Sequence, residues 1–364
     1  MKALLLDALQ TGLRLFPWPT ETGLRRSGSP GSSSPVLVTC NYDLTVRRLM
    51  AELGGIDAWV VVAPSRGVNV WCAAAGGLLT TSQVITALKT SGVEKEVTNK
   101  RAVLPQLAAT GVLGREVAKR SGWKVVFGPV HARDLPRYLE AGMKKDGSMR
   151  RVRFGARERS EMAIAWAFPT SLLLGALLAL VSVSWGLVAV TQAWLMSFLV
   201  FFVYDRMGRL RWPVLWLVSA TAALAWPLSV GATLVNCGQA LVSTTLILAV
   251  LTFDHAGSTP TVGGSHFDSR RWAITLDSAA CVGVYNCEAV CPETCFEQVP
   301  GSRTIELAHE DRCVKCGACV VQCPVDALYY QDDSGRRIEP ATIRRYKLNL
   351  FGQRSVEVAG GGAV

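Results

Sequence analysis

Eight of the eleven cysteines lie within one short stretch, residues 281–323. The second half of this stretch contains a complete run with fixed spacing, Cys313-x2-Cys316-x2-Cys319-x3-Cys323-Pro324. In iron–sulfur domains with this spacing, the first three thiolates bind one cluster and the cysteine before proline binds the other. The run therefore predicts iron–sulfur clusters rather than a zinc site or a chance spacing. Such clustering also argues against a disulfide framework and indicates a reducing compartment.

A less regular run precedes it, Cys281-x5-Cys287-x3-Cys291-Pro292, with Val284 where the full pattern has a cysteine. Cross-ligation assigns one cluster to four residues: Cys291, Cys313, Cys316 and Cys319. The other cluster takes Cys281, Cys287 and Cys323, and its fourth ligand is open. Either Cys295 completes a [4Fe–4S] cluster there, which we expect, or the site holds [3Fe–4S]. In the second case Cys295 is a spare thiol packed nearby.

A ninth cysteine, Cys72, stands in a stretch of small residues that follows a predicted strand and precedes a helix. The stretch reads Asn69-Val70-Trp71-Cys72-Ala73-Ala74. Small residues after Cys72 allow a large, flat ligand to approach the backbone closely. A thiolate is also a soft, strongly donating metal ligand. Taken alone, the pattern favours an ordinary buried cysteine.

The elements that must position Cys72 alternate between short apolar runs and amphipathic stretches. Strands are expected at 36–39, 58–63, 102–104 and 124–127, and helices at 45–53, 82–90, 115–120 and 133–140. This rhythm predicts an α/β, Rossmann-like domain with a parallel sheet over residues 36–155. Residues 1–35 are interpreted as an N-terminal segment, without signal-peptide features, and a Gly/Ser/Pro-rich linker from residue 20.

Four uncharged apolar stretches follow, at residues 163–181, 187–204, 212–228 and 232–253. Each is long enough to cross a bilayer, so residues 162–254 predict a four-helix transmembrane domain rather than a buried bundle. Short turns are expected at 182–186 and 229–231. Arginines flank the spans on one side only, which places both soluble parts in the cytoplasm by the positive-inside rule. The net charge of +10 is then largely explained by the arginines that set the membrane orientation, and nucleic acid is not expected as a partner.

The remaining chain divides into an α+β two-cluster ferredoxin domain, residues 270–332, and a basic tail, residues 333–364. The tail is interpreted as a solvated or lipid-facing segment rather than a site. Two further cysteines lie outside the cluster region. Cys40 ends the first strand and is interpreted as a buried structural thiol, with an approach to a ligand as the alternative. Cys237 lies in the fourth span and is interpreted as a packing residue, with a metal-relay role as the alternative.

Residues 69–74 resemble the cap-helix motif of the mercury-methylation corrinoid proteins (the HgcA family). The resemblance continues at residues 56–59, 104–107, 128–130 and 149–154. The order of a corrinoid domain and a multi-span membrane domain is also that of the family. The C-terminal domain resembles the ferredoxin partner of that family (HgcB), here fused in one chain. The resemblance covers roughly residues 35 to 330.

The resemblance implies that Cys72 is the lower axial cobalt ligand of a cobalamin-type corrinoid, with Asn69, Val70, Trp71, Ala73 and Ala74 around it. Most corrinoid methyl carriers instead use a histidine in Asp-x-His-x-x-Gly, a pattern absent around His131, His255, His266 and His309. The implied activity is methyl transfer to Hg(II), with membrane lipid around the spans and a folate-type or corrinoid methyl donor. The two clusters, fed by an upstream electron donor, would reduce the cobalt again.

The chain departs from that family at three places. Ala75-Gly76 replaces the Gly-Lys of the motif, Val284 replaces a cluster cysteine, and residues 359–364 lack the usual vicinal cysteine pair. Two alternatives therefore stand beside methyl transfer to Hg(II). One is corrinoid-dependent methyl transfer to a metabolic thiol or a metalloid. The other is a membrane-anchored ferredoxin that carries electrons and has a vestigial corrinoid domain.

Overall fold

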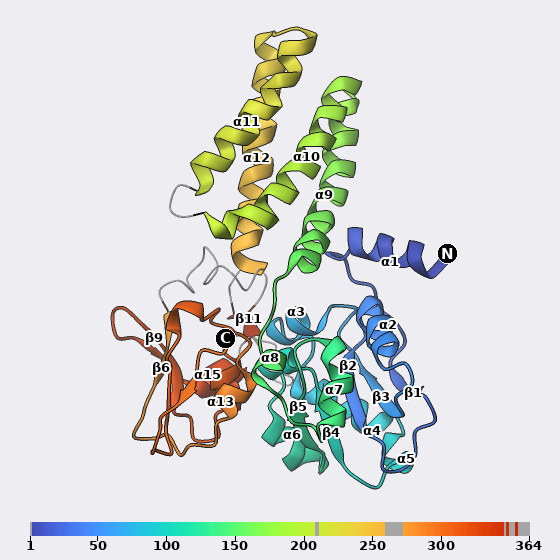
Figure 1. The fold of residues 1–364 in the computed structure, drawn as a ribbon, viewed down its shortest axis with the longest axis vertical. Coiled ribbons are helices and arrows are strands. Elements are labelled where there is room, and N and C mark those ends of the chain that lie inside the picture. Colours follow the sequence, from blue (N-terminus) through green and yellow to red (C-terminus); the bar gives the residue numbers. More distant parts are fainter. Residues whose placement is uncertain (1, 208–210, 259–271, 346, 349–353, 356–364) are drawn as a thin grey trace. The chain divides into compact units, whose positions relative to one another are not determined.

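The computed structural model describes residues 2–207, 211–258, 272–345, 347–348 and 354–355. The chain divides into two compact units (Figure 1). One contains Met1–Phe16 and Arg153–His266, and the other contains Pro17–Val152 and Phe267–Val364. The soluble α/β and cluster domains therefore belong to a single unit, although the apolar helices separate them in sequence.

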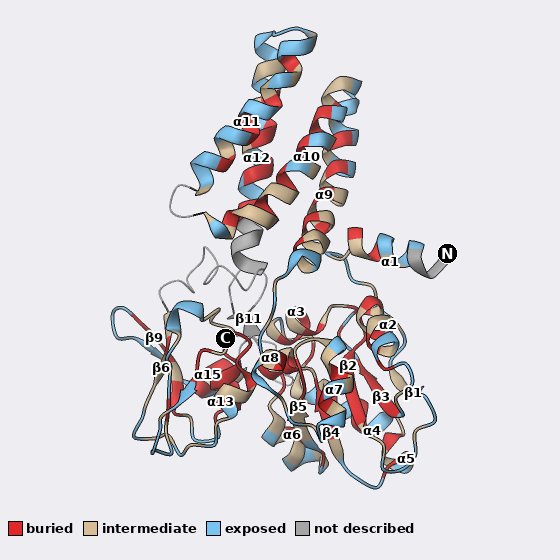
Figure 2. Ribbon diagram, viewed as in Figure 1, coloured by how far each residue is buried: buried red, intermediate tan, exposed pale blue. Residues whose placement is uncertain are grey.

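The α/β domain is built on a five-stranded sheet in the order β1-β3-β2-β4-β5. The four predicted strands are present and mutually parallel: β2 (Val36–Cys40), β3 (Ala58–Ala63), β4 (Arg101–Leu104) and β5 (Lys124–Phe127). Every residue of β2 and β3 is buried (Figure 2). Their valine-rich sequences suit strands that are covered by helices on both faces.

The interpretation of residues 20–35 as a linker was wrong. Gly23–Ser27 forms β1, which pairs antiparallel with β3 at the edge of the sheet. Its sequence, Gly-Leu-Arg-Arg-Ser, has one large apolar residue and two arginines, which is acceptable only at an edge. The α/β domain therefore begins within residues 1–35, at Pro17, rather than at residue 36.

Helices cover the sheet close to the predicted positions. They are α2 (Asp43–Glu52), α3 (Val70–Ala75), α4 (Thr81–Thr90), α5 (Val93–Glu96), η1 (Gln106–Thr110), α6 (Gly114–Ser121), η2 (Ala132–Asp134), α7 (Leu135–Glu140) and α8 (Gly147–Arg150). Two hydrophobic clusters lie on opposite faces of the sheet, one around Trp59 and Trp123 and the other around Leu53 and Tyr138. The element η1 was not predicted, and it becomes important at the site.

The cluster domain is a small α+β fold. It contains β6 (Trp272–Leu276), α13 (Asn286–Val290), β7 (Glu297–Gln298), β8 (Ile305–Glu306), η5 (Glu310–Arg312), α14 (Ala318–Gln322), β9 (Leu328–Asp332), β10 (Arg337–Ile338) and α15 (Pro340–Arg345). Strands β10, β9 and β6 form one antiparallel sheet. The short strands β11 (Lys347–Leu348) and β12 (Arg354–Ser355) pair with each other.

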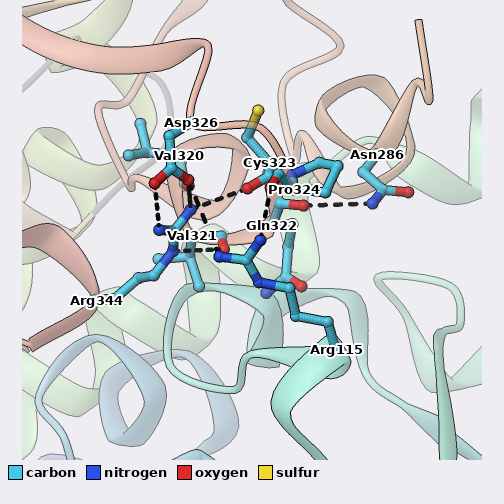
Figure 3. A network of polar contacts seen from close by, with 9 residues as sticks. All are labelled: Arg115, Asn286, Val320, Val321, Gln322, Cys323, Pro324, Asp326 and Arg344. Carbon is cyan, nitrogen blue, oxygen red and sulfur yellow. Dashed lines mark hydrogen bonds and ion pairs between the residues drawn. The ribbon is translucent and has the colours of Figure 1, made fainter. Parts of the chain in front are cut away.

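The residues after 332 are not simply a solvated tail, because β10 and α15 belong to the cluster domain. Arg344 on α15 binds the Asp326 carboxylate and donates to the Cys323 carbonyl at 2.9 Å (Figure 3). Its side chain is 14% exposed. Arg344 therefore holds the backbone beside one predicted cluster ligand. The rest of the predicted tail lies mostly outside the described residues.

The other unit contains α1 (Lys2–Gly12), α9 (Ala156–Ala179), α10 (Val183–Val203), η3 (Tyr204–Arg206), α11 (Arg211–Val230) and α12 (Leu234–Ser258). Four of its helices are long and apolar enough to cross a membrane: Ala156–Ala179, Val183–Arg206, Arg211–Ser229 and Leu234–Thr252. Their number agrees with the four predicted apolar stretches. Many of their leucines and valines are exposed in the structure (Figure 2).

Two details of the bundle differ from expectation. Gly186 was placed in a turn but lies inside α10, where a Cβ would come within 2.7 Å of the Ala179 Cβ and the Gly175 carbonyl oxygen. The glycine thus allows α9 and α10 to pack closely. Helix α9 also starts seven residues before the predicted span and includes a buried ion pair, Arg159 with Asp205.

Candidate redox and ligand-binding site

The carboxyl ends of the parallel strands meet at one edge of the sheet. The parallel order β3-β2-β4-β5 reverses direction between β2 and β4. In open α/β sheets, ligands bind outside the carboxyl ends at such a reversal. The segment after β3 contains Cys72, and the segment after β4 is η1. The sheet topology therefore brings the predicted cysteine to the edge where a ligand is expected.

Cys72 is exposed and lies in the first turn of α3. The Asn69 side chain caps this helix by accepting a hydrogen bond from the Cys72 backbone N–H at 3.0 Å. The preceding loop is fixed by Asn41, whose buried Oδ1 accepts from the backbone N–H groups of Ser65 at 2.8 Å and Gly67 at 3.0 Å. Sequence reasoning did not identify Asn41, since a single asparagine after a strand carries no distinctive spacing.

The small residues after Cys72 lie in the core. Ala73 and Ala74 are completely buried, and Val70 is 9% exposed. A Cβ on Gly111, which follows η1, would lie only 2.6 Å from the Ala74 carbonyl oxygen. The absence of a side chain at Gly111 therefore allows the chain after η1 to approach α3 closely. Asn69, Trp71 and Cys72 keep exposed surface at the edge.

The two extra cysteines are also placed. Cys40 is 0% exposed at the end of β2, and burial raises the pKa of its thiol. This agrees with its interpretation as a structural thiol. Cys237 is half-buried on α12, in the unit of apolar helices. No ligand role was predicted for His131 or His309. The side chains of His255 and His266 lie outside the described residues.

The cluster cysteines are arranged in two groups. A small cavity is lined by Cys291, Cys295, Cys313, Cys316 and Cys319. Four of these are the cysteines assigned to one cluster by cross-ligation. The donor set fits a cubane cluster, whose irons take Cys thiolates. Among the described residues, no three His, Cys, Asp or Glu side chains converge as closely as the ligands of a single metal ion.

The second group contains Cys287, Cys323 and Cys281. Burial raises the pKa of the Cys287 thiol to about 12, and the nearby Cys323 and Cys281 sulfurs add to the rise. Val284, at the position of the missing cysteine, is 50% exposed. Three cysteines thus stand together here, as the donor set of a [3Fe–4S] cluster or of a cubane with a fourth ligand of another kind would require.

Cys295 lies with the other group, contrary to our expectation. Its backbone N–H is 3.3 Å from the Cys291 sulfur, and its thiol contacts the sulfurs of Cys291 and Cys313. A hydrogen bond from the Cys295 thiol lowers the pKa of Cys291 to about 7. Thr294, with φ of 51°, turns the chain after Pro292 so that Cys295 returns to this group. The four-cysteine cavity therefore has a fifth thiol as a hydrogen-bond donor.

This placement predicts the behaviour of the Cys295→Ala variant. Because four other cysteines line the cavity, we expect the iron content per chain to equal that of the parent protein. Iron analysis and electron paramagnetic resonance of anaerobically purified protein measure this, with Cys319→Ala as the matched control that loses iron. A loss of iron in Cys295→Ala alone, with a new three-iron signal, would assign Cys295 as a ligand.

Two buried titratable groups lie in this region, one lining the cavity and one bound to the backbone of α13. Glu293 is 6% exposed, lines the cavity, and its Oε1 has no hydrogen-bond partner in the described part of the chain. Burial raises the pKa of this carboxyl to about 7. Lys145 donates to the Ala289 carbonyl and to the Gln106 side chain, both at 2.7 Å. Burial, followed by the charge of Arg150, lowers the pKa of Lys145 to about 7.

The element η1 joins the Cys72 region to the cluster domain. On one side it packs against α3, and on the other against α14 and α13. Ala109 of η1 forms a small apolar cluster with Val290 and Ala318, against which Cys316 packs. The element η1 therefore lies between Cys316, a predicted cluster ligand, and the helix α3 that contains Cys72.

Two buried glutamines fix this junction. Gln322 donates to the carbonyls of Ala109 at 2.8 Å and Val112 at 2.7 Å. Gln106 donates to the Cys291 carbonyl at 3.1 Å. An ion pair between Arg150 and Glu288, at 2.5 Å, lies at the same interface. Since buried amide groups are costly to leave unpaired, these bonds specify one relative position of the two domains. Nothing in the sequence pattern identified either glutamine.

Comparisons with known proteins concern both soluble domains. Residues 7–139 match the family model for the CO dehydrogenase/acetyl-CoA synthase delta subunit, and residues 308–329 match the 4Fe-4S binding domain. The gamma subunit of the acetyl-CoA decarbonylase/synthase complex of Archaeoglobus fulgidus is 34% identical over 126 residues, which is 34% of this chain and 26% of the relative. The corresponding subunit of Methanopyrus kandleri is 35% identical over 136 residues, or 37% of this chain and 28% of the relative.

The chain thus spans about a quarter of the length of the curated relatives it matches. The family match includes β1, which agrees with an α/β domain that begins before residue 36. The 4Fe-4S match covers the complete cysteine run from Cys313 to Cys323. The chain therefore combines an α/β domain similar to the CO dehydrogenase/acetyl-CoA synthase delta family, four apolar helices and a 4Fe–4S binding domain.

Proposed function

We propose that this chain is a membrane-bound, corrinoid-dependent methyltransferase that carries its own iron–sulfur reductant. The observation that carries the proposal is the position of η1, which contacts both the Cys72 helix and the helices of the cluster domain. An exposed thiol at the carboxyl edge of the sheet and a four-cysteine cavity thus share one support. The resemblance to mercury-methylation proteins and the match to the acetyl-CoA synthase family both include the region of Cys72.

In this proposal Cys72 would hold the cobalt of a corrinoid, and Asn69 and Trp71 would contact the cofactor beside it. The corrinoid would supply the methyl-carrying metal and its redox chemistry. The role of the chain is to hold the thiolate in place, since a thiolate is a soft, strongly donating metal ligand. The Asn69 cap and the Asn41 contacts fix the backbone from which Cys72 projects.

Electrons would pass through the cluster domain toward Cys72. The group formed by Cys281, Cys287 and Cys323 receives them from an upstream donor. The four-cysteine group follows, because Cys316 packs beside η1. The even number of candidate spans would leave both soluble parts on one side of the membrane, which we assign to the cytoplasm from the flanking arginines.

For the methyl acceptor we propose Hg(II), a soft ion that suits carbanion-like transfer, with a folate-type or corrinoid methyl donor. Transfer to another acceptor is the second candidate, favoured by the match to the acetyl-CoA synthase family. Methyl transfer assays with the loaded full chain separate the two, with Hg(II) offered against thiols in parallel reactions. Methylation of a thiol but not of Hg(II) would replace the first acceptor by the second.

The first experiment is the metal content of anaerobically purified full-length protein. We expect about one cobalt and seven to eight irons per chain, the load of one corrinoid and two clusters. Iron without cobalt, even after incubation with corrinoid, would contradict the methyltransferase proposal. The protein would then be a membrane-anchored ferredoxin whose α/β domain has lost its ligand.

The junction can be tested with Gln322→Leu. The Ala109 and Val112 carbonyls lose their donor, and unpaired buried groups cost about 1–3 kcal/mol each. We expect the iron content to stay unchanged while reduction of the corrinoid by the clusters becomes slower, as measured by stopped-flow absorption. Gln331→Leu is the matched control, because Gln331 bonds only within the cluster domain, to the Gly335 carbonyl. Equal rates in both variants would argue against transfer across η1.

A further inference from the structure

Helix α1 presents one exposed apolar face. Leu5, Leu6 and Leu9 are 64%, 37% and 43% exposed. At 3.6 residues per turn, these positions and the exposed Ala8 lie on the same side of the helix. The chain that leaves the helix continues this character, since Leu15 and Phe16 are also exposed. Water-exposed leucines in this number need a partner surface.

The C-terminal end of α1 is attached to α9. Gly12 packs on the Phe168 ring, and a Cβ at Gly12 would lie 3.1 Å from a ring carbon. Just after the helix, Arg14 pairs with Glu161 at 2.9 Å, and both side chains are largely buried. Figure 1 shows α1 extending sideways from α9 rather than along it. The helix is therefore held by α9 at its C-terminal end, and Leu9 and Leu5 lie about one and two turns before this contact.

The contact lies at a defined level of α9. The charged residues of α9 all precede it, and the last of them is Glu161. The exposed leucines of α9 follow it, starting with Leu172 and Leu173 at 58% and 63%. Phe168 lies four residues before Leu172, which is about 6 Å along a helix. The end of α1 thus meets α9 where a charged segment changes into an apolar, exposed belt.

We propose that α1 is an interfacial helix that lies in the headgroup region of the bilayer, with Leu5 and Leu9 inserted among the acyl chains. A helix with one apolar face lies in the interface plane in this manner. The contact at Phe168 lies about 6 Å along α9 from the first exposed leucine of that helix, so lipid that covers the belt lies next to α1. The proposal rests on the four spans and is independent of the corrinoid and of the clusters.

The test uses the full chain in nanodiscs of phosphatidylcholine and phosphatidylglycerol. A photoreactive diazirine amino acid is introduced at Leu5 or Leu9, positions whose exposure allows the change without disturbing packing. Leu217, 62% exposed on α11, is the positive control, and exposed Glu52 of α2 is the negative control. We expect lipid adducts at Leu5, Leu9 and Leu217, and none at Glu52.

Three results would overturn the proposal. Chain-to-chain crosslinks from Leu5 in place of lipid adducts would assign the face to a second copy. Adducts with water only would show that the leucines are solvated. Lipid adducts absent from Leu217 as well would show that the belt itself does not face lipid. In a Leu5→Asp/Leu9→Asp variant, with the probe at neighbouring Leu6, we expect lipid adducts at Leu6 to be lost while those at Leu217 persist.

Discussion

In the Cys72→Ala variant we expect the cysteine-ligated cobalt spectrum to disappear, while iron content and iron–sulfur absorption remain those of the parent protein. The reason is positional. Cys72 is an exposed thiol at the edge where the proposed cofactor binds, and the cluster cysteines lie in a separate cavity. An exposed Cys→Ala change alters the free energy of unfolding by no more than about 0.5 kcal/mol, so the fold remains intact. Absorption spectroscopy and cobalt analysis of corrinoid-loaded protein measure the effect.

Cys237→Ala is the matched control for Cys72→Ala. Cys237 is a cysteine outside the cluster region and belongs to α12. Its replacement should leave both cobalt and iron spectra unchanged. An unaltered cobalt spectrum in Cys72→Ala would remove the ligand assignment and, with it, the physical basis for the proposed methyl transfer. If only Cys237→Ala lost cobalt, the cofactor would be sought in the other unit.

The Arg159→Ala variant should lose about 3–5 kcal/mol of its free energy of unfolding, because the change leaves the buried Asp205 carboxylate without its partner. Arg159 is 5% exposed. It donates to both oxygens of Asp205, at 2.8 and 2.5 Å, and to the Phe201 carbonyl at 2.6 Å. Together these bonds join the start of α9 to the end of α10. Thermal unfolding in detergent, followed by circular dichroism, measures the loss.

Two further variants identify the interaction that causes this loss of stability. Arg157→Ala removes a neighbouring arginine that is 67% exposed and pairs with Glu161, and such surface pairs contribute about 0–1 kcal/mol. Arg159→Met combined with Asp205→Leu removes both buried charges, so it should recover most of the stability. If the double variant were as unstable as Arg159→Ala, the packing of the guanidinium on Phe154, rather than the charge pair, would be the main contribution.

The parallel strands could be predicted from sequence because a strand covered on both faces must be apolar throughout. Val36–Cys40 and Ala58–Ala63 are such runs. Strand β1 could not, since its sequence has only one large apolar residue and the strand is specified by its backbone pairing with β3. The bundle helices could be predicted for the same reason, because their sequences are apolar throughout. Their exact ends were not, because the charged first turns of α9 are satisfied by tertiary ion pairs.

The cysteines of the site were visible because metal ligation imposes fixed spacing. Spacing alone misassigned Cys295, since it contains no information on the turn at Thr294 that brings the thiol back to Cys291. The junction was invisible for another reason. Gln106 and Gln322 act through single hydrogen bonds to backbone carbonyls of distant segments. Such contacts leave no periodic or compositional trace in a sequence.

The junction at η1 also constrains how the protein can be made. The bond from Gln106 to Cys291 joins residues 185 positions apart, and all four apolar helices lie between them. Domains generally fold as they emerge during synthesis, N-terminal first. The α/β domain must therefore keep the apolar surface around Ala109 and Leu113 uncovered until the bundle is complete and the cluster domain arrives. During this interval the nascent chain needs protection from aggregation, and the final docking step requires that the two halves of the soluble unit meet after the apolar helices have been made.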